Sequence, residues 1–467
     1  MRKIILCLLL VSLGAPCLHA TKAVFQLKSS STVVDQVGAE TLHGVESKDG
    51  KNRALIWEVV TVRYNQKEFD DFNSLASKAA AGRGDQLLTI ADDMINRATK
   101  ALPKDEKVKD ALPFGTTEEE QNWIRLTSRY YRAVGQLQTG KFSDAQASFL
   151  DYMRDAEAYA ATLKAGVKGM PGLIFIKLGA VGFDSPTGAK VPDASLLHRL
   201  YLDALEGLGD AYARAGQAEK ANTEAYDRLV DLTTRLSANA QGRLEFYDWA
   251  VRALRAAANL NIQNKNYVGA QACYKRLETI ASSKAASTGN KLSRELIEAQ
   301  LNVGYMMIKD KKYNDALARF RTAVSNWENS RKSPGSPASD WITPDKAYQV
   351  AGSYLGLGMV ASARAKDNAN ATADDWAQAL NNYSNAVALF NAGEELRGSC
   401  LLYAAEAAAK MGEVALKKKD VALAKRNAET ASTYIYELTE NLKGTPAALD
   451  PDLAAVRKII ETINTAK

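Results

Sequence analysis

The stretch LNVGYMMIKDKKYNDALARFRTAVSNW, residues 301–327, decides the fold. Its apolar residues recur every three to four positions on both sides of the polar turn KDKK, which is typical of two amphipathic helices joined as a hairpin. Small residues lie in both helices, at Gly304 and Ala316, and the aromatic Phe320 follows one turn after Ala316. This spacing predicts two helices whose backbones approach closely around one large side chain.

The same arrangement recurs over most of residues 120–440. A single helical hairpin cannot cover its own apolar stripe, so successive copies must stack to build a continuous core. The copies contain Ala133, Phe142, Ala145 and Phe149; Gly209, Tyr212, Ala221 and Ala225; Ala258, Tyr267, Ala270 and Tyr274; Ala379, Tyr383 and Ala386, after an expanded turn at 366–374; and Gly412, Ala424, Ala428 and Ala431. A degenerate copy is expected at 72–95, with its turn at Gly82-Arg83-Gly84.

These positions resemble those of the tetratricopeptide repeat. In that family a small residue in the first helix admits the second helix, and an aromatic side chain fills the groove one turn later. The resemblance implies a mainly α protein, an α-solenoid of tetratricopeptide-like hairpins. The steps from Gly209 to Ala258 and on to Gly304 are longer than the family period of about 34 residues. We therefore expect longer helices or loops and a less regular superhelix.

Residues 21–65 have a different pattern and are predicted to form a small N-terminal β-rich module. Val24–Leu27, Thr32–Val34, Ala54–Trp57 and Val59–Tyr64 are rich in strand-forming residues, and residues 47–51 are typical of a turn. Our first interpretation is a module that covers the first repeat. A binding role is the alternative.

A second interruption lies at 161–197, between helical segments at 66–160 and 198–443. It contains an apolar run from Leu173 to Phe183 that is flanked by Gly and Pro. We interpret it as a loop that folds back and buries this run against a helix pair. The alternative is that the 170–183 loop makes a weak contact with a partner or a membrane surface.

The two ends of the chain carry distinct signals. Arg2 and Lys3 precede an apolar run and small residues that lead to Ala20, the order of a secretory signal peptide over residues 1–20. Cleavage after Ala20 predicts an exported, periplasmic protein, and lipid anchoring through Cys17 is the alternative. At the other end, residues 444–467 are predicted to form a C-terminal capping helix with one apolar stripe at helical spacing.

The content of histidine and cysteine argues against catalysis. With the signal peptide removed, only His43, His198, Cys273 and Cys400 remain, too few for a Cys/His zinc site or an iron–sulfur cluster. We predict no catalytic residue, no metal site and no cofactor. Cys273 and Cys400 both lie in helical apolar patterns, which favours two core thiols over a long-range disulfide.

The charge of the chain is weak and dispersed. The formal net charge is +6, and it falls to +4 without Arg2 and Lys3, the only charged residues of the signal peptide. Nucleic-acid binding requires a basic stripe, which the sequence lacks. No later segment has the roughly 20 continuous apolar residues of a membrane helix, so we predict no transmembrane span.

The family resemblance also implies candidate binding residues. In tetratricopeptide proteins, certain positions of the first helix of each hairpin line a concave surface that holds peptides. The matching positions in this sequence are Arg252, Arg255, Asn259, Tyr305 and Lys309. We therefore expect a non-catalytic scaffold or adaptor that binds other envelope proteins or peptides.

Carbohydrate binding is the second hypothesis. The chain contains 19 Tyr and 6 Trp, and exported helical-repeat proteins of the starch-utilisation type bind glycans at cell surfaces. Most of these aromatic residues occupy positions expected to pack between helices. This favours the protein-binding hypothesis.

Overall fold

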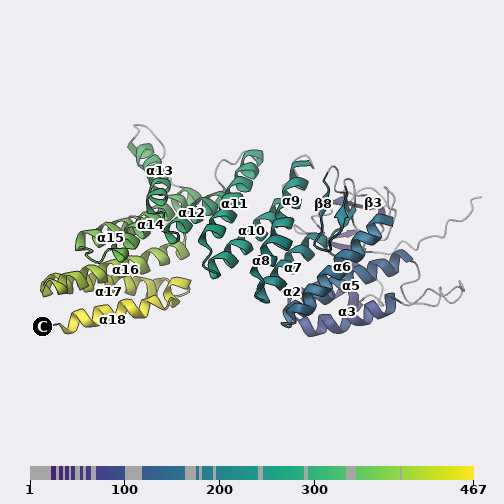
Figure 1. The fold of residues 1–467 in the computed structure, drawn as a ribbon, viewed down its shortest axis with the longest axis horizontal. Helices are drawn as coiled ribbons and strands as arrows, with labels where there is room; N and C mark the ends of the chain where they lie inside the picture. Colours follow the sequence, from purple (N-terminus) through teal and green to yellow (C-terminus); the bar gives the residue numbers. More distant parts are fainter. Residues whose placement is uncertain are drawn as a thin grey trace, which may run out of the picture. The chain divides into compact units, whose positions relative to one another are not determined.

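A computed structural model describes residues 23–27, 31–34, 37–41, 44–47, 53–55, 59–64, 70–99, 118–162, 175–177, 181–192, 196–239, 246–288, 293–332, 343–389 and 392–466. The chain divides into two compact units, Met1–Trp249 and Ala250–Lys467. Helix pairs joined by short turns dominate the described residues of both units (Figure 1).

Between residues 23 and 64 the described residues form six short strands. They form two three-stranded antiparallel sheets, with the strand orders β2-β1-β6 and β3-β4-β5. β3 and β4 have no clear sequence signal, because glycine and acidic residues interrupt them. The strands are β1 (Ala23–Leu27), β2 (Ser31–Val34), β3 (Val37–Thr41), β4 (Gly44–Ser47), β5 (Arg53–Leu55) and β6 (Val59–Tyr64). That this segment is a separate module covering the first repeat stays a prediction.

The helices of the first unit pack in chain order. α3 packs on α5, α5 on α6 and α6 on α7. α3 and α5 cross where two glycines meet: a methyl group on Gly84 would lie 2.9 Å from the carbonyl oxygen of Gly135. The elements are α1 (Asp70–Asn73), α2 (Leu75–Ala80), α3 (Gly84–Ala98), α5 (Glu118–Gln138), α6 (Phe142–Thr162), α7 (Tyr201–Arg214), α8 (Ala218–Lys220), the π-helix η3 (Ala221–Tyr226) and α9 (Asp227–Asn239).

The described part of the 161–197 interruption folds back onto this unit. β7 (Phe175–Lys177) pairs with β10 (Leu196–His198), and β8 (Phe183–Asp184) pairs with β9 (Lys190–Val191). Val181 and Phe183 are buried, and the Phe183 ring packs edge-on against Tyr201. Phe183 therefore offers no exposed apolar surface. Residues 163–174 and 178–180, which carry the rest of the predicted contact loop, lie outside the described residues.

The second unit continues the helix pairs from α10 (Phe246–Gln263), a helix that begins in the first unit. The helix Tyr267–Thr288, with 22 residues, lies within the long step from Ala258 to Gly304. The elements are α11 (Tyr267–Thr288), α12 (Arg294–Lys309), α13 (Tyr313–Lys332), α14 (Pro344–Asp367), α15 (Ala373–Val387), α16 (Glu394–Lys417), α17 (Val421–Tyr436), the π-helix η6 (Glu437–Asn441), the 3-10 helix η7 (Pro446–Leu449) and α18 (Asp452–Thr465).

Glycines on the first helix of a hairpin make room for an aromatic ring of the second. A methyl group on Gly304 would lie 2.4 Å from the Phe320 ring, and one on Gly356 would lie equally close to the same ring. Phe320 is thus held between α12 and α14 and is 1% exposed. Gly358 accommodates Tyr383 in the same way. These contacts are the close approach that the sequence predicts.

One hairpin departs from the predicted spacing. The sequence places Ala225 at the aromatic position opposite Gly209, but the structure places the Tyr226 ring there, 2.4 Å from a methyl group built on Gly209. The cause is the π-helical segment Ala221–Tyr226, because a π turn holds one residue more than an α turn. The extra residue places the Tyr226 side chain, instead of Ala225, opposite Gly209.

The short turns inside these hairpins share one recurring geometry, whereas the expanded turn between α14 and α15 contains no left-handed residue. In the α12–α13 turn the backbone of Lys311 is left-handed, with φ 59°, and the amide of Lys312 donates to the carbonyl of Met307. This is a Schellman motif, which satisfies the carbonyls at the end of the first helix. Left-handed residues occur at the matching places of five further described turns: Gly82, Gly140, Gly216, Lys265 and Lys419.

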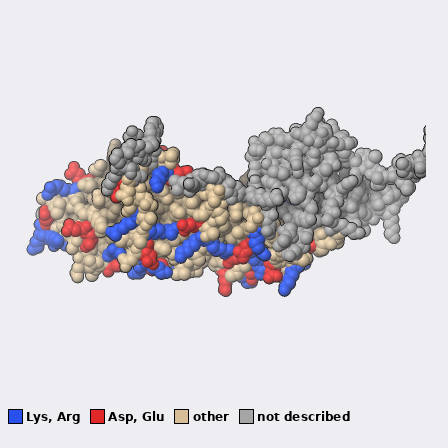
Figure 2. Space-filling view, turned by 90° about the horizontal axis from the view of Figure 1, so that it is seen from above, with Lys and Arg blue, Asp and Glu red and all other residues tan. Residues whose placement is uncertain are grey.

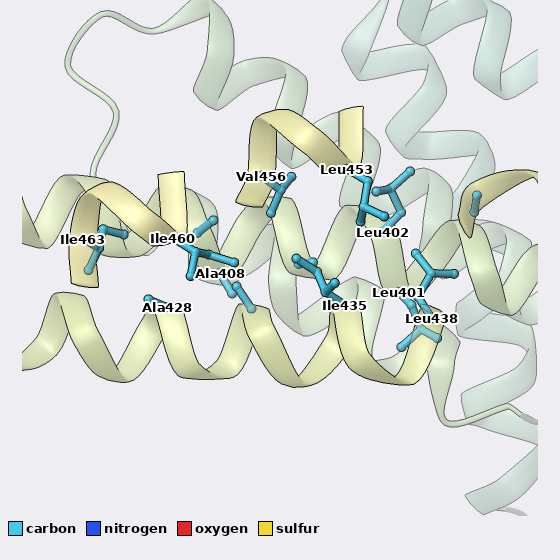
Figure 3. Packing of buried hydrophobic residues seen from close by; sticks show 14 of the residues in the cluster. Leu401, Leu402, Ala408, Ala428, Ile435, Leu438, Leu453, Val456, Ile460 and Ile463 are labelled. Carbon is cyan, nitrogen blue, oxygen red and sulfur yellow. The ribbon is translucent and has the colours of Figure 1, made fainter. Parts of the chain in front are cut away.

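The C-terminal helix α18 packs on α16 and α17. Its residues Leu453, Val456, Ile460 and Ile463 point toward the two helices beneath it, where they meet buried side chains such as Leu402 and Ala408 (Figure 3). One helix face therefore closes the apolar side of the last hairpin.

Neither Cys273 nor Cys400, both in the second unit, is in a disulfide bond, and Cys400 is completely buried.

None of the described helices combines the length and apolar character that crossing a bilayer requires.

Candidate functional site

Three of the five predicted binding residues lie on α10. Arg252 and Asn259 are exposed, and Arg255 is half-buried. The Arg255 guanidinium donates to a Glu298 carboxylate oxygen at 2.8 Å, which ties α10 to α12. Arg255 therefore has a structural partner in the next hairpin.

The ion pair of Arg255 extends along the first helices of successive hairpins. Glu298 also accepts from Arg294 at 3.1 Å, and the Arg294 guanidinium stacks over the Tyr348 ring on α14. The chain of contacts joins α10, α12 and α14 on one face. Because these groups are partly exposed, each pair contributes at most about 1 kcal/mol to stability.

The other two predicted residues lie on α12 in different surroundings. The Tyr305 hydroxyl donates to the carbonyl of Gly352 at 2.9 Å, and its ring contacts Phe320. Burial raises the pKa of Tyr305 well above its ordinary value, so the hydroxyl stays protonated. Lys309 is exposed in the last turn of α12. The structure thus shows Tyr305 packing α12 against α14, and partner binding by either residue stays a prediction.

A groove that the sequence does not indicate lies in the second unit. It has a volume of about 660 Å³ and is formed by α11, α12, α13 and α14. None of the five predicted binding residues lines it. Its lining consists of Glu278, Gln300, Leu301, Met307, Asp315, Ala318, Arg319, Phe320, Thr322, Ala323, Asn326, Gln349 and Ser353.

Arg319 connects three of the four helices that form the groove. From α13, its Nε donates to the backbone carbonyl of Gln300 on α12 at 2.8 Å, and its Nη2 donates to Glu278 on α11 at 2.7 Å. Arg319 and Glu278 are each less than one-third exposed. The pair fixes the guanidinium within the groove and largely cancels the charge of Glu278.

The floor of the groove is buried and mostly apolar. Leu301 is 4% exposed and Phe320 is 1% exposed, and Ser353 beside them donates to the carbonyl of Gln349 at 2.7 Å. Above this floor, the carboxamides of Gln300 and Gln349 approach each other at 3.5 Å. The Gln349 Oε1 also accepts from the Lys346 ammonium at 3.0 Å. A carboxamide carries two N–H donors and two acceptor positions, so each still has at least one further donor and acceptor for a ligand.

Asp315 supplies a further charge at one end of the groove. It lies in the first turn of α13 and is exposed. Arg319, one turn further along the same helix, is directed to Glu278 and Gln300 instead. In the described part of the chain Asp315 makes no ion pair, so its negative charge is not neutralised by a neighbour.

The first unit contains a second polar cluster, which is structural. The Glu157 carboxylate accepts hydrogen bonds from Ser185, from Thr187 at 2.8 Å and from Tyr201 at 2.5 Å. Ser185 and Tyr201 are buried. These bonds fasten the β8–β9 turn to α6 and α7.

His198 also has a structural environment. The sequence places it at the start of a helix, but it ends strand β10 and is completely buried. Its Nδ1 lies 2.6 Å from the Tyr152 hydroxyl. Among the described residues no group of three His, Cys, Asp or Glu side chains is arranged to hold a metal ion.

Basic and acidic side chains are mixed on the surface. Figure 2 shows Lys and Arg side chains interspersed with Asp and Glu over the coloured residues of the visible face. No large region of one sign stands out there.

The comparisons with known proteins yield distant structural similarities. No protein-family model matches the sequence, and no curated protein matches it. A crystal structure of BtubC (BKLC) from P. vanneervenii is 15% identical, covers 66% of this chain and 91% of its own, and has a TM-score of 0.32.

Two further solved structures have lower TM-scores. A Rap protein complexed with Competence and Sporulation Factor is 10% identical, with 84% of this chain and 86% of its own covered and a TM-score of 0.28. A circular tandem repeat protein is 12% identical and has a TM-score of 0.26. The match covers 85% of this chain and 84% of that protein. The assignment of stacked hairpins therefore depends on the packing described above.

The groove residues were missed because they belong to neighbouring hairpins. Asp315, Thr322 and Asn326 do repeat at helical spacing on a polar face of α13. That face is visible in the sequence as a solvated stripe. Which helices flank it depends on how the hairpins stack, and the sequence gives no direct signal for that.

Proposed function

We propose that this protein is a non-catalytic scaffold or adaptor of the bacterial envelope that binds other polypeptides along its helical-repeat surface. The observation that carries the proposal is the groove lined by α11–α14, with its apolar floor, its fixed arginine and its carboxamides. A concave site of this volume is within the usual range for ligand sites, about 300–1,000 Å³.

The lining favours a polypeptide over a glycan. Sugar rings are commonly held on exposed aromatic faces, and the aromatic residue of this groove, Phe320, is buried under the helices that hold it. Carboxamides, in contrast, match the donors and acceptors that every peptide main chain carries. We therefore place carbohydrate binding second.

A photo-crosslinking experiment tests whether the groove binds a polypeptide or a glycan. Benzoylphenylalanine at Thr322 lies within the groove, and at Ser325 it lies on the same helix outside the lining. After irradiation of envelopes from the producing cells, we expect polypeptide adducts at position 322 only, identified by mass spectrometry. Equal adducts at both positions, or adducts to glycan alone, contradict the proposal.

The proposal includes export and an absence of catalysis. Export is inferred from the predicted signal peptide. The absence of catalysis is inferred from the two histidines that remain when that peptide is removed. Mass spectrometry of the mature N-terminus tests the location. A free Thr21 supports a periplasmic protein, and lipid on Cys17 supports surface anchoring.

A further inference from the structure

We propose that the groove between α11 and α13 binds an extended polypeptide segment through its main chain and selects a Lys or Arg side chain of that segment at Asp315. The inference specifies the ligand of the same groove and so rests on the proposed function. It is independent of the first-helix positions that the sequence suggested.

The dimensions of the α13 face set the length of the segment. Asp315, Thr322 and Asn326 all line the groove, and 11 residues separate the first from the last. At a rise of 1.5 Å per residue this is about 16 Å along the helix. An extended chain covers that distance with about five residues, at about 3.3 Å each.

The side chains along this face suit a main chain. Ala318 and Ala323 are small, so a peptide backbone reaches the helix surface without meeting a bulky group. Asn326 and Gln349 then supply carboxamides from two helices. Because every residue of a peptide except proline presents an N–H and a C=O, these contacts bind a segment largely regardless of its sequence.

The charges in the groove supply selectivity. Among the lining residues, Glu278 and Arg319 neutralise each other, which leaves the carboxylate of Asp315 as the excess charge; the Lys346 ammonium, outside the lining, donates to Gln349 at 3.0 Å. A cationic side chain of the ligand gains an ion pair there, and an acidic one is repelled. The first turn of a helix favours an acid for reasons of its own stability. The test therefore needs a control: an acidic residue in the first turn of another helix, away from the groove. Asp374 in the first turn of α15 meets this need, because it is exposed and does not line the groove.

The experiment pans a phage-displayed library of random nonapeptides against the purified full chain. We expect the selected peptides to share a Lys or Arg at a fixed position. Asp315→Asn should weaken their Kd about two- to fivefold, the effect of one partly exposed ion pair. Asp315→Lys should shift the selection to Asp or Glu, and Asp374→Asn should leave both Kd and selection unchanged.

A blocking variant separates this inference from the proposed function. Ala318→Trp fills the groove, and Ser325→Trp adds the same side chain elsewhere on α13; circular dichroism confirms that both fold. One outcome is that the selected peptides bind the Ser325→Trp variant but not the Ala318→Trp variant, while Asp315→Asn leaves their Kd unchanged. That result refutes the preference for Lys or Arg and leaves polypeptide binding in the groove in place. If no selected peptide is sensitive to Ala318→Trp, the groove is not the binding site and the proposed function is overturned as well.

Discussion

Gly304 shows how strongly a single residue determines the packing of a hairpin. Its α-carbon faces the Phe320 ring, and Gly356 lies against the same ring. We expect Gly304→Ala to lower the free energy of unfolding by about 1–3 kcal/mol, the usual effect of overpacking a filled core. Thermal or urea unfolding measures the change.

Gly444 provides the control for this prediction. A methyl group on Gly444 meets no atom within 4 Å, and the residue is exposed. Gly444→Ala should therefore change stability by less than about 0.5 kcal/mol. Equal effects of the two substitutions would show that the contact with Phe320 is not what restricts position 304.

The thiols of Cys273 and Cys400 should differ in reactivity. Burial raises the pKa of Cys400 to about 12, so its thiol stays protonated at every pH below that value. Cys273 is only partly buried. At pH 8 we expect a thiol reagent such as DTNB to label Cys273 in the native protein, and Cys400 only after unfolding, because the thiolate is the reactive form. Rapid native labelling of both thiols would contradict the buried position of Cys400.

At the scale of the element, the recurring turn offers a direct test. Lys419 has φ 63°, a left-handed backbone that disfavours any residue with a β-carbon. Lys419→Gly should therefore stabilise the protein by about 0.5–1 kcal/mol, measured by chemical unfolding. The neighbouring Lys418 has φ −84°, so the same substitution there should destabilise the helix end. A loss of stability at position 419 would argue against the left-handed turn.

The π-helical segment shows why register is hard to predict from sequence. Gly304 and Phe320 are 16 positions apart, as are Ala258 and Tyr274, whereas Gly209 and Tyr226 are 17 apart. A fixed spacing selects Ala225 and misses the ring that fills the space. The extra residue leaves no mark in the apolar pattern, because both Ala225 and Tyr226 are buried.

At the scale of the whole molecule, sequence periodicity predicts the hairpins well and the binding surface poorly. Each hairpin is a local unit, so the small residues and the aromatic that shape it lie within about 30 positions of one another. The groove is assembled from four helices between Glu278 on α11 and Ser353 on α14. Arg319 and Glu278, 41 residues apart, meet only after the hairpins have stacked.

The helix that follows the last hairpin limits how copies of this chain associate. α18 occupies the face of α16 and α17 against which another hairpin would stack, and it turns Arg457, Lys458 and Glu461 outward as exposed side chains. Head-to-tail addition through a repeated face is the route by which subunits grow into filaments. A second copy approaching this face would meet charged groups instead of an apolar stripe, so α18 disfavours polymerisation by continued stacking at this end.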